Sequence, residues 1–227
     1  MKNKFLGGLL FCFLTVTALA GQGVRRPAVA GVFYDADPAR LAAFIEAGLD
    51  AAPEKAVSGD IAALIVPHAG YACSGAIAAR GYRQLKGRAY DAVVVIGPSH
   101  HVAFEGCSIY PRGGYETPLG VAAIDERLAA ELAKRTRFGF VAAAHEGEHS
   151  LEVQVPFLQT VLPGTPIVPV VMGRNARRNI QTLADGLVEA GAGKKILVVA
   201  STDLSHYLSK RRANAVDGRT IEIIKGY

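Results

Sequence analysis

Short apolar runs alternate along the chain with segments in which apolar residues recur at helical spacing. The runs span residues 61–66, 92–96, 107–110, 121–124, 138–141, 167–171 and 196–200. Runs of this length, rich in valine and isoleucine, are typical of strands, and a continuous run without polar positions indicates a strand buried on both faces. Between the runs, helical spacing covers segments after Asp37, Ser74 and Asp125 and over 180–190 and 213–224. This alternation predicts an α/β fold, a layered sheet with helices on both faces, in one domain.

The apolar spacing also predicts which helix faces are buried. Asp37-Pro38 is a strong helix start, because aspartate caps free N–H groups and proline suits the first helical position. That helix should bury Leu41, Phe44, Ile45 and Leu49. The helix from Ser74 should turn inward Ile77, Ala78, Gly81, Tyr82 and Leu85.

Composition narrows the class of protein. Of the 227 residues, 50% are hydrophobic and 20% are charged, which excludes a disordered chain. The net charge is +5, and it falls to +3 when Lys2 and Lys4 are set aside. The basic groups are short and separated, so we expect no nucleic-acid partner.

The first twenty residues differ from the rest. Lys2 and Lys4 precede an uncharged apolar stretch that ends in Ala18-Leu19-Ala20. This order is that of a secretory signal peptide with an A-x-A cleavage site, and sixteen apolar residues are short for a membrane span. We therefore expect a cleaved signal at 1–20, no stable membrane span, and export, in a bacterium to the periplasm. Cys73 and Cys107 then either pair in an oxidising compartment or stay free thiols.

Histidines follow three of the predicted strands. His68 comes after the run at 61–66, His100 and His101 after 92–96, and His206 after 196–200. Ligands bind at the carboxyl ends of strands in open α/β sheets. If the three strands are neighbours, their ends bring these imidazoles into one crevice; otherwise each is an ordinary loop histidine. Imidazoles suit iron, copper or zinc, and Asp203, Glu146 and Glu148 are all available as a third ligand.

The segment HEGEH (145–149) matches H-E-x-x-H, in which one helical turn places two histidines on zinc. An exported metalloprotease is therefore an alternative hypothesis for the function. Gly147 in the middle of the motif and Pro156 downstream argue against a regular helix there. The alternative is a helix that starts at His149-Ser150 and turns Glu152 and Gln154 toward the crevice.

Six segments of the chain form a recognisable set: RRPAVAGVFY (25–34), VPHAGYACSGAIAARGY (66–82), VVVIGPSHHVAFEGC (93–107), TPLG (117–120), EHSLEVQVPFL (148–158) and STDLSHY (201–207). Together they resemble the MEMO family, also known as AmmeMemoRadiSam system protein B. They come in the family's order and cover nearly all of 25–207. The resemblance implies one MEMO-like domain over 21–227, with a fold similar to class III extradiol dioxygenases and a site for non-haem iron.

The resemblance also assigns residues. His68 and His100 match the family's metal-binding histidines, and His206 matches a histidine beside the site in the position of an acid/base. Asp203 of the same DLSHY motif is grouped with His206 as a candidate catalytic residue. His101, His149 and Glu152 are expected to line the crevice or support the ligands.

One family feature is absent from the sequence. The resemblance implies a third metal ligand, a cysteine in a C-terminal segment, and this chain ends at Tyr227 without it. We therefore expect the C-terminal part of the family domain to be missing. By resemblance, AMMECR-type and radical-SAM proteins are possible partners, beside an unidentified small molecule or peptide.

Two functions follow as hypotheses. The first is a metal-binding protein, with iron the first choice and copper or zinc as alternatives, that carries out redox or dioxygenase-like chemistry. The second is a non-catalytic protein that holds a peptide or partner in a vestigial dioxygenase site. Whether the chain is an enzyme is left open by the sequence.

Overall fold

The computed structural model describes residues 23–53, 57–135, 137–174 and 176–226. The predicted signal peptide, Met1–Ala20, lies outside this part of the chain. Within it, no helix is both long and apolar enough to cross a membrane.

The main sheet has six strands in the order β2-β9-β3-β8-β4-β7. Its strands are β2 (Ala63–Val66), β3 (Ala92–Pro98), β4 (Cys107–Ile109), β7 (Phe138–Gly139), β8 (Ile167–Met172) and β9 (Ile196–Ser201). The four strands β2, β9, β3 and β8 run parallel, and β4 pairs antiparallel to β8. The predicted α/β layered sheet is therefore confirmed, and β3 at its centre is buried as far as Val95.

A second, smaller sheet joins the N-terminal segment to a hairpin. It consists of β1 (Val24–Arg25), β5 (Gly114–Thr117) and β6 (Gly120–Ala123), in the order β1-β5-β6. The β1–β5 pair is parallel and the β5–β6 pair is antiparallel. This sheet fixes the segment that begins at Arg25 beside the main body of the protein.

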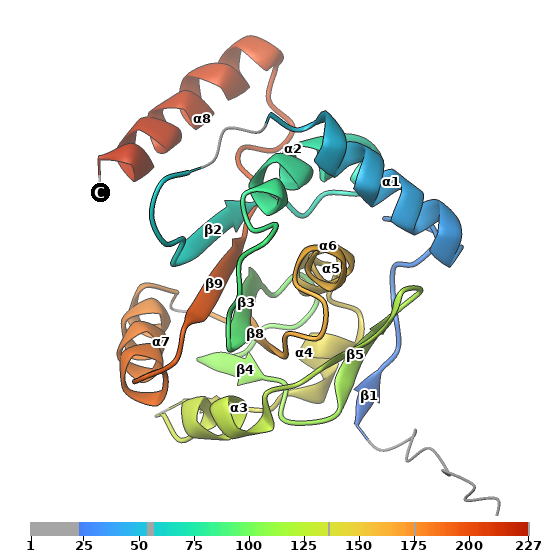
Figure 1. Cartoon of the computed structure of the whole chain (residues 1–227). Helices are drawn as coiled ribbons and strands as arrows, with labels where there is room; N and C mark the ends of the chain where they lie inside the picture. The colour runs from blue at the N-terminus through green and yellow to red at the C-terminus, as the bar shows by residue number, and fades with distance from the viewer. Residues whose placement is uncertain (1–22, 54–56, 136, 175, 227) are drawn as a thin grey trace, which may run out of the picture.

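Helices cover both sides of the main sheet (Figure 1). On one side α1 (Pro38–Ala51), α2 (Tyr71–Arg83) and α6 (Val155–Val161) pack together, with the short α4 (Ala142–Glu146) and α5 (His149–Glu152) nearby. On the other side α3 (Glu126–Ala133) packs against α7 (Ala176–Ala190). The last helix, α8 (Lys210–Lys225), lies beside the β2 edge and buries none of its residues.

Helix boundaries follow the capping rules in two cases. Asp37 accepts a hydrogen bond from the Arg40 amide at the start of α1, and Asp125 accepts one from Leu128 at the start of α3. Both side chains satisfy amides that have no partner within their helices. The predicted starts at Asp37 and Asp125 are therefore confirmed.

Four local predictions are wrong. Helix α2 begins at Tyr71 instead of Ser74, and β3 continues through Gly97 and Pro98, beyond the predicted run at 92–96. Phe44 stays 42% exposed because its ring stacks on Tyr71 at the surface between α1 and α2, at 5.6 Å between centroids. Ile77 is 56% exposed and faces the cavity between α2 and α8 instead of the core.

Candidate metal centre

The histidine-bearing strand ends lie side by side. Strand β9 pairs with β2 on one side and with β3 on the other, all in parallel. The carboxyl ends of these strands therefore meet at one edge of the sheet, where His68 follows β2, His100 follows β3 and Asp203 follows β9. This arrangement gives the predicted crevice a structural basis.

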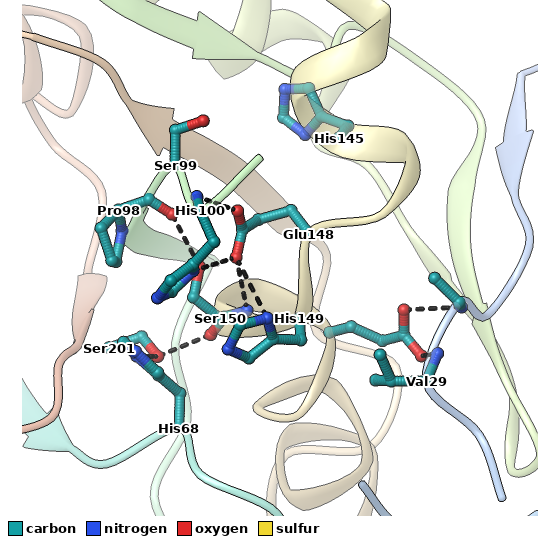
Figure 2. A network of polar contacts seen from close by, with 12 residues as sticks. Val29, His68, Pro98, Ser99, His100, His145, Glu148, His149, Ser150 and Ser201 are labelled. Atoms are coloured by element: carbon teal, nitrogen blue, oxygen red, sulfur yellow. Dashed lines mark hydrogen bonds and ion pairs between the residues drawn. The ribbon is translucent and has the colours of Figure 1, made fainter. Parts of the chain in front are cut away.

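Three histidines converge at this edge, and one ring nitrogen from each of His68, His100 and His149 lies within 4.8 Å of the others. Figure 2 shows their rings facing one another from three separate segments. His68 is buried, His149 is half-buried, and His100 is exposed at the opening. We expected His68 and His100 as ligands, and the structure adds His149, which we had expected only to line the crevice.

The ring of His68 is oriented by Ser201. The Ser201 hydroxyl donates to the Ser150 carbonyl oxygen at 2.6 Å, so its single proton is already used. The 3.1 Å contact between His68 Nδ1 and Ser201 Oγ is therefore a bond that Nδ1–H donates. In the neutral ring this leaves the lone pair on Nε2, the nitrogen that points away from Ser201.

Glu148 plays the corresponding part for His100. The His100 Nδ1 lies 2.8 Å from Glu148 Oε1, and the His100 backbone amide donates to Oε2 at 2.7 Å. A carboxylate only accepts, so Nδ1 carries the proton and Nε2 keeps its lone pair. The same carboxylate lies 3.7 Å from His149 Nδ1. Glu148 thus orients His100 through a hydrogen bond, as in carboxylate–histidine–metal arrangements, and places its charge near His149.

The charge states of the cluster favour metal binding. Burial lowers the pKa of both His68 and His149 below the ordinary histidine value, which favours the neutral rings. Burial opposes ionisation of Glu148, but hydrogen bonds from the His100 and Ser150 amides outweigh it and hold the pKa of that carboxyl below its usual value. Neutral imidazoles beside a carboxylate are the protonation state that a metal requires.

A glycine in β3 lets α5 come close enough to deliver His149. A Cβ at Gly97 would overlap the Ser150 hydroxyl, which donates to the Pro98 carbonyl oxygen at 3.1 Å. Any larger residue at position 97 would push α5, and His149 with it, away from the strand end. Gly97 is therefore needed for close approach and not for a turn.

A buried ion pair fixes the turn that precedes His149. Arg25 contacts Glu152 at 2.5 Å, with 4% and 0% of the two side chains exposed. Arg25 also donates to the carbonyl oxygens of His145, Glu146 and Glu148. The turn that carries Glu148 and His149 is thereby tied to the N-terminal segment.

The Glu152 carboxylate is fully occupied by that segment. It accepts from the amides of Ala28 and Val29 and from the Tyr34 hydroxyl, in addition to Arg25. In Figure 2 the contacts to Val29 lie on the side of α5 away from the histidines. The expectation that Glu152 turns toward the crevice is therefore wrong, because Arg25 and these amides hold both of its oxygens. Gln154, predicted alongside it, does reach the strand ends, donating to Ser201 Oγ at 2.8 Å.

Asp203 links His68 to His206. Its Oδ1 accepts from the His68 amide at 2.7 Å, and its Oδ2 lies 3.9 Å from His68 Nε2. On the solvent side, the same Oδ2 lies 3.6 Å from His206 Nε2, and 58% of the His206 side chain is exposed. The two candidate catalytic residues are therefore next to the cluster, with Asp203 between His206 and the ring of His68.

The HEGEH segment does not form a zinc-binding helix. Helix α4 ends at Glu146, Gly147 caps it, and a new helix begins at His149. His145 is buried apart from the cluster, with Nδ1 2.6 Å from the Tyr115 hydroxyl and Nε2 2.9 Å from Ser108 Oγ. Both ring nitrogens are occupied, so the zincin interpretation is wrong for a geometric reason.

The remaining candidates lie at the margin. His101 is exposed, with its ring centroid 6.4 Å from that of His100 and 6.2 Å from that of His149. Cys73 and Cys107 are free; Cys73 is exposed, and burial raises the pKa of Cys107 to about 12. Of the two alternatives for the cysteines, the structure has the free thiols.

The donor set fits a first-row divalent metal. Three imidazoles offer nitrogen ligands that suit iron, copper and zinc, and Asp203 supplies a carboxylate close to one of them. The orienting partners Ser201 and Glu148 were missed from the sequence. Glu148 had been considered only as a ligand, and no local pattern singles out Ser201.

Comparison with known proteins identifies the family of the chain. The Memo-like protein family model matches residues 25–226. A MEMO1 family protein of Methanobrevibacter smithii is 39% identical over 215 residues, covering 89% of this chain and 76% of the relative. A second, from Methanothermobacter thermautotrophicus, is 37% identical over 213 residues, covering 88% of this chain and 76% of the relative. The resemblance seen in the six sequence segments is thus confirmed, and the chain belongs to the Memo-like family.

Proposed function

We propose that the protein binds a divalent metal, iron as the first choice, between His68, His100 and His149, and that it uses the metal in redox or dioxygenase-like chemistry. One observation carries the proposal. Three ring nitrogens lie within 4.8 Å of one another, while Ser201 and Glu148 occupy the opposite nitrogens of two of the rings. Buried polar atoms are unfavourable without a partner, and a bound metal would supply one to the ring nitrogens that face the centre of the cluster.

A bound metal would supply Lewis-acid activation and open coordination positions. The residues around it divide the other tasks. Glu148 and Ser201 keep the protons on the outer nitrogens of His100 and His68, and Asp203 holds the His68 segment in place through its amide. His206, exposed beside Asp203, is placed to give a proton to a substrate or to take one from it.

A non-catalytic binding protein is the second candidate. The observation in its favour is a cavity of about 740 Å³ between α2 and α8, lined largely by apolar side chains and bordered by Asp203 and His206. A cavity of this size next to the crevice suits a peptide or an apolar ligand. In this case metal binding would be structural and no turnover would be measured.

Metal analysis of the purified protein tests the first proposal. We expect about one equivalent of metal in the wild type and large losses in His68→Ala, His100→Ala and His149→Ala. The controls are His101→Ala and His206→Ala, which remove histidines outside the cluster and should retain the metal. Equal metal in all six proteins would contradict the assignment.

Oxygen consumption separates the two functions. The metal-loaded protein is assayed with a panel of catechols in an oxygen electrode. Consumption that is lost in His206→Ala with metal content unchanged would support catalysis with His206 as acid/base. A loaded protein that consumes no oxygen with any member of the panel would favour the binding function.

A further inference from the structure

A second cavity opens on the other side of the histidine cluster. It has a volume of about 410 Å³ and is lined by residues 98–103, which follow β3, and by residues 172–174, at the end of β8. Small-molecule sites occupy roughly 300–1,000 Å³. Because His100 belongs to both the cavity wall and the cluster, a molecule in this cavity lies next to the proposed metal.

The cavity wall has a distinct charge. None of its lining residues is acidic, whereas Arg174 and two histidines are among them. The Ser99 hydroxyl is already engaged, donating to the Val102 carbonyl oxygen at 2.6 Å. The polar groups that face a ligand are therefore cationic or hydrogen-bond donating, and a bound metal would add further positive charge.

Arg174 has a fixed backbone and an uncommitted side chain. Its amide donates to the Phe104 carbonyl oxygen at 2.7 Å, and its own carbonyl oxygen accepts from the buried Asn179 side chain at 2.6 Å. Asn179 also donates to Gly106, which ties the end of β8 to the loop after β3. Within the described residues, the Arg174 guanidinium has no ion pair or hydrogen bond.

His101 is placed on the same wall without a polar partner of its own in the part of the chain that the structure describes. Its ring lies against Gly147, where an added Cβ would come within 3.6 Å of His101 Cδ2. Gly147 also ends α4, and a side chain at this position would make only ordinary van der Waals contact with the ring. The cavity wall thus holds one arginine and two imidazoles, with the apolar side chains of Val102, Ala103 and Met172 as further lining.

We propose that this cavity binds a small anionic molecule, with its carboxylate or phosphate group on Arg174 and the rest of the molecule directed toward the cluster at His100. The proposal rests on the proposed function, for which it names a class of substrate. The planar guanidinium matches both kinds of oxyanion with two parallel hydrogen bonds. The chemistry excludes cationic ligands, since every charged group on the wall is positive.

Isothermal titration calorimetry with succinate, glutarate and inorganic phosphate tests the proposal, on metal-loaded and metal-free protein. We expect Arg174→Gln to weaken binding by about 10- to 100-fold, as the loss of a charge-assisted bidentate pair does. Arg174→Lys keeps the positive charge but lacks the planar guanidinium, so its affinity for the anions should lie between those of the wild type and Arg174→Gln. The matched control, Arg178→Gln, removes an exposed arginine of α7 that does not line the cavity, and it should bind as the wild type does.

The three probes also identify the kind of anion. Tighter binding of a dicarboxylate assigns a carboxylate ligand, tighter binding of phosphate assigns a phosphate ester, and Arg174 should matter for either. Equal affinities of wild type and Arg174→Gln for all three probes would overturn the proposal, as would binding of neutral succinamide as tight as that of succinate, or no binding at all. Arg174-dependent binding in a wild-type protein that takes up no metal when metal is added would uphold the anion site and overturn the proposed function instead.

Discussion

His145 and the His68–His100–His149 cluster, only a few residues apart in the sequence at their closest point, represent two opposite ways of placing histidine in a protein. His145 has a hydroxyl on each ring nitrogen, from Tyr115 and Ser108, and lies buried in the core. In the cluster, partners occupy only the outer nitrogens, and the inner ones face one another. The histidine whose ring nitrogens both have hydroxyl partners is part of the core, and the histidines whose inner nitrogens face one another are those we propose as metal ligands.

The two carboxylates in the same segment divide in the same way. Glu152 is used up by Arg25 and the N-terminal segment, which makes it part of the scaffold. Glu148, four residues earlier, holds His100 and faces His149, which makes it part of the site. Arg25 touches both groups, since it pairs with Glu152 and donates to the Glu148 carbonyl oxygen.

Removal of Arg25 should break both regions at once, and we expect this to be the largest effect. Arg25→Met leaves the Glu152 carboxylate buried without its cation and frees three carbonyl oxygens of the turn. Loss of one partner of a buried ion pair costs about 3–5 kcal/mol. Urea unfolding of the chelator-treated protein measures the change in the free energy of unfolding.

The neighbouring arginine provides the control. Arg26 pairs with Glu116 at the surface with 82% of its side chain exposed, so Arg26→Met should cost about 0–1 kcal/mol. Equal losses in the two variants would mean that the buried network contributes no more than a surface pair, contrary to the scaffold role.

Substitution of Glu148 should weaken the cluster and leave the scaffold intact. The two oxygens of the Glu148 carboxylate accept from the backbone amides of His100 and Ser150. In Glu148→Gln one of these oxygens is replaced by an NH₂ group, which then faces an N–H donor in either orientation of the side chain. Loss of such an orienting carboxylate typically reduces metal affinity by about 10- to 100-fold. Competition with a chromophoric chelator measures this affinity, and circular dichroism checks the fold.

Glu146→Gln is the matched control, because Glu146 belongs to the same HEGEH segment but is exposed. It should bind metal like the wild type. If both variants kept wild-type affinity, Glu148 would be part of the scaffold and the contrast with Glu152 would disappear.

Much of this arrangement follows from the sequence, up to a definite point. Apolar runs predicted the strands, and the ends of three of them predicted where histidines would lie. The pattern does not state strand order, however: β9, last in the chain, lies between β2 and β3, and only this insertion brings Asp203 between His68 and His206. Family resemblance identified His68 and His100 as metal ligands. It did not identify the residues that contact them, because a sequence motif does not specify which residues lie next to it in space.

His149 and Glu148 show why the rest could not be predicted. Their placement depends on Gly97 in a distant strand, which admits α5, and on Arg25, which is more than a hundred residues away and selects Glu152 in preference to Glu148. Glu148 and Glu152 are four residues apart in one short segment, and the local sequence does not indicate which of them pairs with Arg25 and which faces the histidines. Long-range packing decides between them.

The last prediction concerns His145 and the acid side of the stability curve. Burial, with the nearby Arg25 charge, lowers the pKa of His145 to about 3, whereas the unfolded chain has an ordinary value near 6.5. Between these values the unfolded state binds more protons, so stability is full above pH 6.5 and falls as the pH drops toward 3. The slope from this group approaches about 1.4 kcal/mol per pH unit.

His145→Gln should be less stable near pH 7 but lose stability less steeply, so that the two curves converge in acid. Urea unfolding with chelator, at intervals from pH 7.5 to 4.5, measures both curves. The pKa of His68 and that of His149 are lowered in the same direction, but both residues are present in each protein, so their contributions cancel in the difference. Parallel curves would show that His145 is not held neutral, and with that its contrast to the metal-binding cluster would fail.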